Sequence, residues 1–303
     1  FVLGVLMALQ PVVAQFDGAG DRPEGGRATR QGFWIALAVS LPYVFILLSG
    51  EVLLRWMEVD AAIIPTAVEY MDALAWGAPG ICMVLFLRFF SEGSGNTRPT
   101  MYLGLMGVAF NVPLNYILMF GKLGMPALGA QGCGYATSIV MWLQALMMFN
   151  YVRSHRHYEG FELFKHWDWP HWPAIQRLLR VGLPIGGTIF VEGSLFIAAA
   201  LLIARLGPLP ASAHLIAINW SALMFMVPLG LASAVTTRVG NAHGRGEPEA
   251  ARYAGLIGFV IVLATQTLSA GAMFLVPEFI VRIYTDDAAI TAIAVSLLFF
   301  SAI

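Results

Sequence analysis

Glu192 has the most unusual setting of any acidic residue in the 303-residue chain. It lies near the middle of an apolar stretch, Pro184–Leu206, with the sequence PIGGTIFVEGSLFIAAALLIARL. A helical span needs about 20 apolar residues, so this stretch can cross a bilayer. A carboxylate inside a membrane costs at least about 2.5 kcal/mol, which a functional role usually offsets. The expected chemistry of Glu192 is binding of a cation, a proton or a polar substrate; hydrogen bonding to a neighbouring helix is the alternative.

Two asparagines form a second polar group, in the segment FNVPLNYIL. Asn111 and Asn115 are four residues apart and therefore share one face of a helix. Pro113 lies between them and removes the donor that would satisfy the carbonyl of Ala109. Two amides and a freed carbonyl can bind a cation or take part in a proton-linked hydrogen-bond network. Hydrogen bonding between helices would account for these polar residues equally well. Thr137, in YATSIV, is a weaker candidate whose default role is packing.

The composition indicates a polytopic membrane protein. Hydrophobic residues make up 58% of the chain and charged residues only 12%, with a mean hydropathy of +0.74. Soluble domains carry about 25% charged residues. No basic run suggests a nucleic-acid partner. No nucleophile–base pair or cluster of metal ligands is found, so neither an enzyme nor an organic cofactor is expected.

Nine apolar segments between polar breaks predict nine membrane spans, the first and last incomplete. Thirteen of the 17 Lys and Arg residues fall in loops on one side, which the positive-inside rule makes cytoplasmic. The chain starts and stops within apolar segments, which predicts a fragment. The segments cover about residues 1–15, 33–49, 66–90, 100–120, 134–152, 182–206, 211–237, 254–276 and 289–303.

An internal repeat predicts two parallel halves. Glu51–Ile63 (EVLLRWMEVDAAI) aligns with Glu278–Ile290 (EFIVRIYTDDAAI) at an offset of 227, and six of the thirteen positions are identical. The loop Gly18–Arg27 parallels His243–Arg252 on the same side. Parallel repeats are related by an axis along the membrane normal. The span with Glu192 then begins the second half, and each half would hold six helices, or twelve in the full protein.

Three regions follow from the repeat. Residues 1–152 form an N-terminal lobe lacking its first helix, residues 153–181 a cytoplasmic linker, and residues 182–303 a C-terminal lobe truncated in its fourth helix. The linker is rich in His, Trp and Pro, and its tryptophans suit a membrane interface. Its amphipathic segment PAIQRLLR, at Pro173–Arg180, either lies along the membrane surface or is a solvated connector.

Several longer motifs extend over the whole chain: GVLMALQPVVAQFDGAGD, RFFSEGSGNTRP, FNVPLNYILMFGKLGMPALGAQGCGYAT, PIGGTIFVEGSLF, VPLGLASAVTTRVGNAHG and YTDDAA. In combination they resemble the multidrug and toxic compound extrusion family, most closely its bacterial NorM-type branch. The resemblance implies an all-α fold of two six-helix bundles. It also implies a multi-pass protein of the bacterial inner membrane, and a monomer is expected.

The resemblance further implies a cation-coupled antiporter, with Na⁺ or H⁺ as the coupling ion. Such a protein exports amphipathic, often cationic, drugs and dyes from the cytoplasm by alternating access. Glu192 matches the family's acidic residue in the first helix of the second lobe. Asn111 and Asn115 match polar positions of the first lobe's cation site, which Thr137 would join. The family carries two further acids, one in a helix before residue 1 and one just after Ile303, and both fall outside this sequence.

Two alternatives remain beside drug export. A lipid-linked precursor flippase shares the fold but should place Arg or Lys in its central cavity, whereas every Lys and Arg here can be placed in a loop or at a span end. A non-transporting membrane scaffold or receptor would leave Glu192 and the asparagine pair unexplained. The pattern favours cation-coupled export, without choosing between Na⁺ and H⁺ or naming the drugs.

Overall fold

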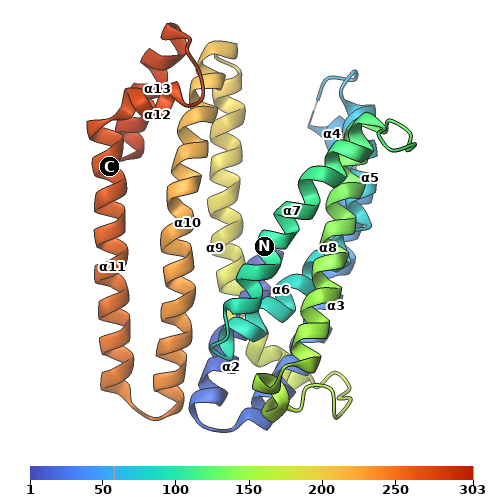
Figure 1. The fold of residues 1–303 in the computed structure, drawn as a ribbon, viewed down its shortest axis with the longest axis vertical. Helices are drawn as coiled ribbons and strands as arrows, with labels where there is room; N and C mark the ends of the chain where they lie inside the picture. Colours follow the sequence, from blue (N-terminus) through green and yellow to red (C-terminus); the bar gives the residue numbers. More distant parts are fainter. Residues whose placement is uncertain (58, 303) are drawn as a thin grey trace. The chain divides into compact units, whose positions relative to one another are not determined.

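The computed structural model describes residues 1–57 and 59–302, and these form helices joined by turns and loops, with no strand among them (Figure 1). The predicted all-α class is therefore confirmed. The helices are α1 (Val2–Met7), α2 (Leu9–Gly18), α3 (Arg22–Leu48), α4 (Gly50–Trp56), α5 (Ile64–Ala75), α6 (Ala78–Gly93), α7 (Arg98–Phe120), α8 (Gly129–Ser154), the 3-10 helix η1 (Arg156–Phe161), α9 (Trp172–Ala204), α10 (Pro208–Gly244), α11 (Pro248–Leu275), α12 (Pro277–Arg282) and α13 (Ala288–Ser301).

Each of the nine predicted spans corresponds to helical structure in the described part of the chain. Six helices are long and apolar enough to cross a membrane: α3, α7, α8, α9, α10 and α11. Helices α5 and α6 make a seventh candidate span, bent by 48° at the break between them. Helices α1 with α2, and α13, are apolar but shorter. The count of nine thus rests on six full-length helices, one bent pair and two shorter segments.

The internal repeat is visible in local structure. In the first copy, α4 precedes Asp60, whose carboxylate accepts a hydrogen bond of 2.9 Å from the backbone N–H of Ala62. In the second copy, α12 precedes Asp287, which accepts a bond of 2.8 Å from the N–H of Ala289. Both are turns in which an aspartate side chain bonds its own backbone two residues on. Each copy is thus a short helix followed by a turn into the next helix, α5 or α13.

Packing divides the chain into two compact units, described here separately. Unit 1 contains Phe1–Gly187 and Gly240–Gly246, and unit 2 contains Thr188–Val239 and Glu247–Ile303. The division falls within α9 and within α10, so one end of each of these helices packs with unit 1.

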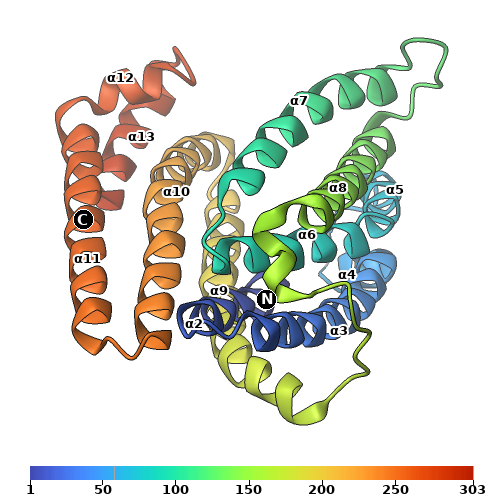
Figure 2. The ribbon, with the colours of Figure 1, turned by 60° about the horizontal axis from the view of Figure 1, so that its bottom comes forward.

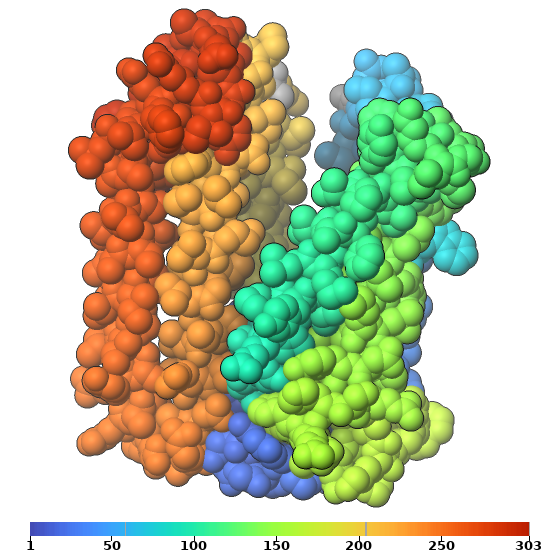
Figure 3. Space-filling view, in the orientation of Figure 1, coloured from blue at the N-terminus to red at the C-terminus, as the bar shows by residue number. Residues whose placement is uncertain are grey.

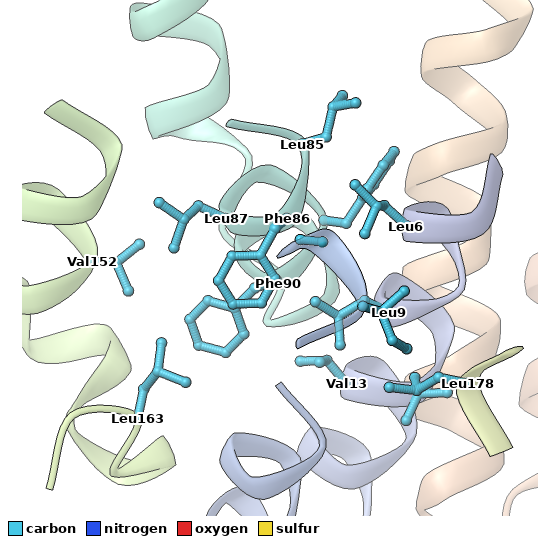
Figure 4. Packing of buried hydrophobic residues seen from close by; sticks show 14 of the residues in the cluster. Leu6, Leu9, Val13, Leu85, Phe86, Leu87, Phe90, Val152, Leu163 and Leu178 are labelled. Carbon is cyan, nitrogen blue, oxygen red and sulfur yellow. The ribbon is translucent and has the colours of Figure 1, made fainter. Parts of the chain in front are cut away.

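Unit 1 is built around one apolar cluster. Helices α1, α2, α3 and α6 contribute most of its residues, and α8, η1 and the first turns of α9 complete it. Figure 4 shows Phe86 and Phe90 of α6 between Leu9 and Val13 of α2 on one side and Val152 of α8 on the other. Helix α7 packs chiefly on α8 and leaves one face open along the surface of unit 1 (Figures 2 and 3).

Unit 2 has a smaller core. Residues of α10, α11, α12 and α13 meet in a cluster in which Ala213, Val281, Ala294 and Leu298 are fully buried. Helices α10 and α11 also approach closely at Gly258, where an added Cβ would overlap the side chain of Val235. Helix α12 and α13 lie against the end of α11 (Figure 1).

Two sequence-based boundaries are corrected. The second span was expected at residues 33–49, but α3 begins at Arg22, where Asp21 caps the helix by accepting from the N–H of Glu24 and Pro23 fits the first turn. The segment Pro173–Arg180 is neither a separate surface helix nor a connector, because it forms the first turns of α9. Pro173 fits the first turn of α9, and no glycine or proline follows it until Gly182, so the helix continues directly into the membrane span.

Small residues join α10 to α2 within unit 1. Gly240 and Gly244 are four residues apart on α10, and Ala14 and Gly18 are four apart on α2. A Cβ built on Gly244 would overlap the carbonyl oxygen of Gln15, and one built on Gly18 would overlap the carbonyl of Asn241. Pairs of small residues at this spacing let two membrane helices approach backbone to backbone. We call this contact the α2–α10 seam.

Candidate functional site: a carboxylate-lined cavity

A cavity of about 590 Å³ lies within unit 2, lined by α9, α10, α11 and the end of α13. Glu192 and Phe196 of α9, one helical turn apart, both face it. Met224 and Phe225 of α10 and Met273 of α11 supply apolar walls. Met224 and Phe225 belong to the apolar run Leu223–Val227 (LMFMV).

Glu192 is exposed to the cavity and is not enclosed by hydrocarbon side chains. This exposure removes much of the desolvation cost that a charge meets in lipid. Within the described part of the chain, the carboxylate makes no hydrogen bond or ion pair. It is therefore not a structural link between helices, and its oxygens are available to a ligand.

Four polar residues that sequence reasoning missed also line the cavity: Ser221, Gln266, Ser269 and Ser301. Gln266 and Ser269 are three residues apart and share a face of α11. Their signal was present in the stretch ATQTLSAGA, where polar residues interrupt an apolar span. They place amide and hydroxyl oxygens in the same cavity as a single carboxylate, and such oxygens are ligands suited to Na⁺ or to a protonated site.

The lining also suits an organic cation. Glu192 is the only charged residue among those that line this cavity. Aromatic rings such as Phe196 and Phe225 attract cations through their faces, and methionine side chains adapt to differently shaped apolar ligands. The arrangement can therefore bind a metal cation, a proton or an amphipathic organic cation at one place.

The asparagine pair lies in unit 1, on α7. The side-chain amide of Asn115 donates a hydrogen bond of 2.8 Å to the side-chain Oδ1 of Asn111, so the predicted shared face is observed. The Oδ1 atom of Asn115 is buried and has no hydrogen-bond partner among the described residues. A buried acceptor left unpaired costs about 1–3 kcal/mol. Such an oxygen is suited to receive a cation or a donor.

Thr137 lies on α8, and no hydrogen bond joins its side chain to the asparagines among the described residues. Helices α7 and α8 pack so that Gly132 meets the carbonyl of Leu118 and Gln144 donates to the carbonyl of Leu103. This register places Thr137 at roughly the level of the asparagine pair. Its hydroxyl, however, donates to the carbonyl of Cys133 in its own helix at 3.0 Å. The described residues contain no group of three or more His, Cys, Asp or Glu that could hold a metal ion.

Replacing both asparagines by leucine should separate function from stability. We expect the double variant Asn111→Leu with Asn115→Leu to leave the free energy of unfolding unchanged or to raise it by about 1 kcal/mol. The reason is that both amides are removed, so no buried polar atom is left without a hydrogen bond. Gradient-driven transport should fall about tenfold, the effect of losing one hydrogen bond to a charged group. Melting temperature and transport report the two effects. Thr236→Val on α10, which removes a hydroxyl that donates to the carbonyl of Ala232 in its own helix, is the control and is expected to change neither. A loss of stability without loss of transport would assign the pair to packing.

Comparison with known proteins identifies the family. The sequence profile of the family described as MatE matches residues 1–117 and 184–303. The chain belongs to the MatE family. Among its relatives, the "Probable multidrug resistance protein NorM" of Xanthomonas campestris pv. campestris is 44% identical over 99% of this chain and 66% of its own length. The "Multidrug resistance protein PmpM" of Pseudomonas aeruginosa is 41% identical over 99% of this chain and 63% of its length.

Solved MatE structures share the fold. The crystal structure of a eukaryotic MATE transporter superposes with a TM-score of 0.86 at 20% sequence identity, over 99% of this chain and 66% of that chain. A multidrug resistance MATE family transporter in an outward-facing conformation gives a TM-score of 0.84, also at 20% identity. The MatE chain described here spans about 66% of the length of its curated relatives. With six candidate spans and relatives of this kind in Gram-negative bacteria, it is a multi-pass inner-membrane protein.

Proposed function

We propose that the full-length protein is a secondary transporter, not an enzyme, and exports amphipathic organic cations in exchange for Na⁺ or H⁺. The observation that carries the proposal is the cavity of unit 2, where one unpaired carboxylate, Glu192, faces methionine and phenylalanine walls. The names of the relatives, which describe multidrug resistance proteins, support the substrate class. No organic cofactor is needed, and the protein is proposed to work as a monomer.

Exchange follows from competition for one negative charge. When Glu192 holds Na⁺ or a proton, the cavity is neutral and a cationic drug loses its electrostatic partner. When the coupling ion leaves toward the cytoplasm, the carboxylate is free to attract the drug, and Phe196 adds a cation–π contact. In an alternating-access cycle, ion binding from outside then releases the drug outward. Neighbouring Ser221, Gln266 and Ser269 offer oxygens that would complete a shell around Na⁺.

The asparagine pair is proposed as a separate cation or proton site. It lies in unit 1, whereas Glu192 lies in unit 2. The unpaired oxygen of Asn115 supports a ligand there. In the family pattern, two further acids would accompany these sites. Helix α13 reaches the cavity of unit 2 at Ser301, so an acid in the following turn would lie close to Glu192.

The two alternative functions are less well supported. A flippase for pyrophosphate-linked lipids needs cations in its cavity, and none of the residues that line the cavity of unit 2 is Lys, Arg or His. A scaffold has no need of an unpaired carboxylate in a span, which costs free energy without a compensating bond.

Efflux from vesicles tests the proposal. The full-length protein, reconstituted into liposomes loaded with ethidium, should release the dye when an inward Na⁺ or pH gradient is imposed. Collapse of the effective gradient with an ionophore should stop release, and the gradient that works identifies the coupling ion. Release that is indifferent to both gradients would contradict coupled export, and transport of a lipid-linked pyrophosphate instead would favour the flippase.

A further inference from the structure

A second cavity, of about 530 Å³, lies within unit 1 between the linker and helices α3, α6 and α8. We call it the linker pocket. It is distinct from the transport cavity and plays no part in the function proposed above. Its floor is buried and apolar, formed by Phe86 and Leu87 of α6 and Leu163 of the linker (Figure 4). The volume is in the range of pockets that hold small molecules, about 300–1,000 Å³.

Five Phe and Trp side chains line the pocket above this floor. Phe33, Trp34 and Trp167 meet edge to face, with ring centroids 5.6–6.2 Å apart. Phe149 of α8 and Phe164 of the linker form a second edge-to-face pair at 5.1 Å. Trp167, Phe149 and Phe164 are all exposed at the rim. Exposed aromatic rings around an apolar floor are what a membrane interface presents to a lipid chain.

The linker is held over the pocket by α3. The guanidinium of Arg30 donates to the carboxylate of Asp168 at 2.6 Å and to the backbone carbonyl of Glu162 at 3.0 Å. The indole N–H of Trp34 donates to the carbonyl of Asp168 at 3.0 Å. Only 13% of the Arg30 side chain is exposed. These bonds make the pocket a preformed feature of unit 1 and not a gap beside a loose loop.

Basic side chains at the pocket retain unused donors. Arg30 uses two of its five N–H groups on the contacts above. Lys165 donates to Glu162 at 2.8 Å, which uses one of three, and the ammonium lowers the pKa of that carboxyl. His166 is exposed beside them, with its Nε2 4.0 Å from the same Glu162 carboxylate. The one acid that lines the pocket, Asp168, is already paired with Arg30. A phosphate group would therefore meet donors and no unpaired carboxylate.

We propose that the linker pocket binds an anionic phospholipid of the cytoplasmic leaflet, with its phosphate at Arg30, Lys165 and His166 and an acyl chain between the aromatic walls. The position agrees with the charge pattern. Helix α3 starts, and helices α6 and α8 end, in the loops that the distribution of Lys and Arg assigns to the cytoplasm. Basic pockets between membrane helices on that side are typical sites for anionic headgroups. The space between the aromatic rings of the linker pocket favours a lipid over a soluble phosphate, because a soluble phosphate would leave that space empty.

Native mass spectrometry of the full-length protein in detergent tests the proposal. Phosphatidylglycerol should bind more tightly than phosphatidylethanolamine or phosphatidylcholine with the same acyl chains. Lys165→Gln with His166→Gln should weaken phosphatidylglycerol binding about fivefold or more, the effect of removing one basic residue at an anionic membrane surface. Both side chains are exposed, so the variant should fold normally. Arg156→Gln removes an exposed charge of the same linker outside the pocket and should leave binding unchanged.

Further measurements address each part of the proposed contact. Phe164→Ser, at the exposed rim of the linker pocket, should weaken the binding of all three lipids alike if an acyl chain lies between the aromatic rings. Glycerol phosphate at millimolar concentration should not displace the bound lipid. Equal binding of the three lipids by the wild type, unchanged phosphatidylglycerol binding in the Lys165/His166 variant, or displacement by glycerol phosphate would each overturn the proposal. Transport activity is not the readout, so failure here leaves the proposed export untouched.

Discussion

Glu192→Gln in the full-length protein is expected to lower gradient-driven dye efflux about tenfold or more while leaving the protein folded. The carboxylate has no partner among the described residues, so its removal breaks no internal bond. The amide keeps the size and polarity of the side chain but carries no charge for Na⁺, a proton or a cationic drug. Loss of one charge-assisted contact is worth about 1.5–3 kcal/mol, which corresponds to a fall in efflux of about tenfold or more.

Two matched variants sharpen that experiment. Glu192→Asp keeps a carboxylate on the same turn of α9 and should retain part of the efflux. Glu249→Gln removes an exposed acid from the first turn of α11, outside the cavity, and should behave as wild type. Melting temperatures of all three should lie close to that of the wild type. If Glu192→Gln transports normally, or if Glu249→Gln loses as much activity, Glu192 does not carry the coupling.

The sequence predicts Glu192 well because one charge inside a long apolar run is rare and costly. It does not predict that the carboxylate faces an open cavity, since that depends on how α9, α10 and α11 pack. Gln266 and Ser269 were missed for a related reason. A neutral polar residue is common in membrane helices, where it often bonds its own backbone, as Thr137 does with Cys133. Only the fold distinguishes a cavity-lining glutamine from such a residue.

The ends of the helices show the same difference between what hydropathy predicts and what depends on local structure. The nine apolar segments were predicted because hydropathy reports spans directly. The starts of α3 and α9 were placed too late, since their first turns carry charged residues such as Arg27 and Arg177. Those turns extend beyond the apolar stretch, and capping by Asp21 sets the beginning of α3. Hydropathy therefore finds where a helix is in lipid and not where its hydrogen bonding begins.

Adding a methyl group to the α2–α10 seam is expected to destabilise the protein strongly. In both Gly18→Ala and Gly244→Ala the new Cβ would overlap a backbone carbonyl of the opposite helix, of Asn241 and Gln15 respectively. Backbone cannot move aside as a flexible side chain can, so the helices must separate. Overpacking of this kind costs about 1–3 kcal/mol per substitution. A lower melting temperature in detergent for each variant is the measurement.

The two substitutions together distinguish a shared seam from two separate clashes. Once one methyl group has forced α2 and α10 apart, the second finds room, so the double variant should lose clearly less than the sum of the single losses. Gly230→Ala is the control on α10, because a Cβ there meets no atom within 4 Å. It should be neutral or slightly stabilising, since alanine favours a helix by about 0.5–1 kcal/mol over glycine. Additive losses, or an equal loss in Gly230→Ala, would mean that close approach of these two helices is not what the glycines provide.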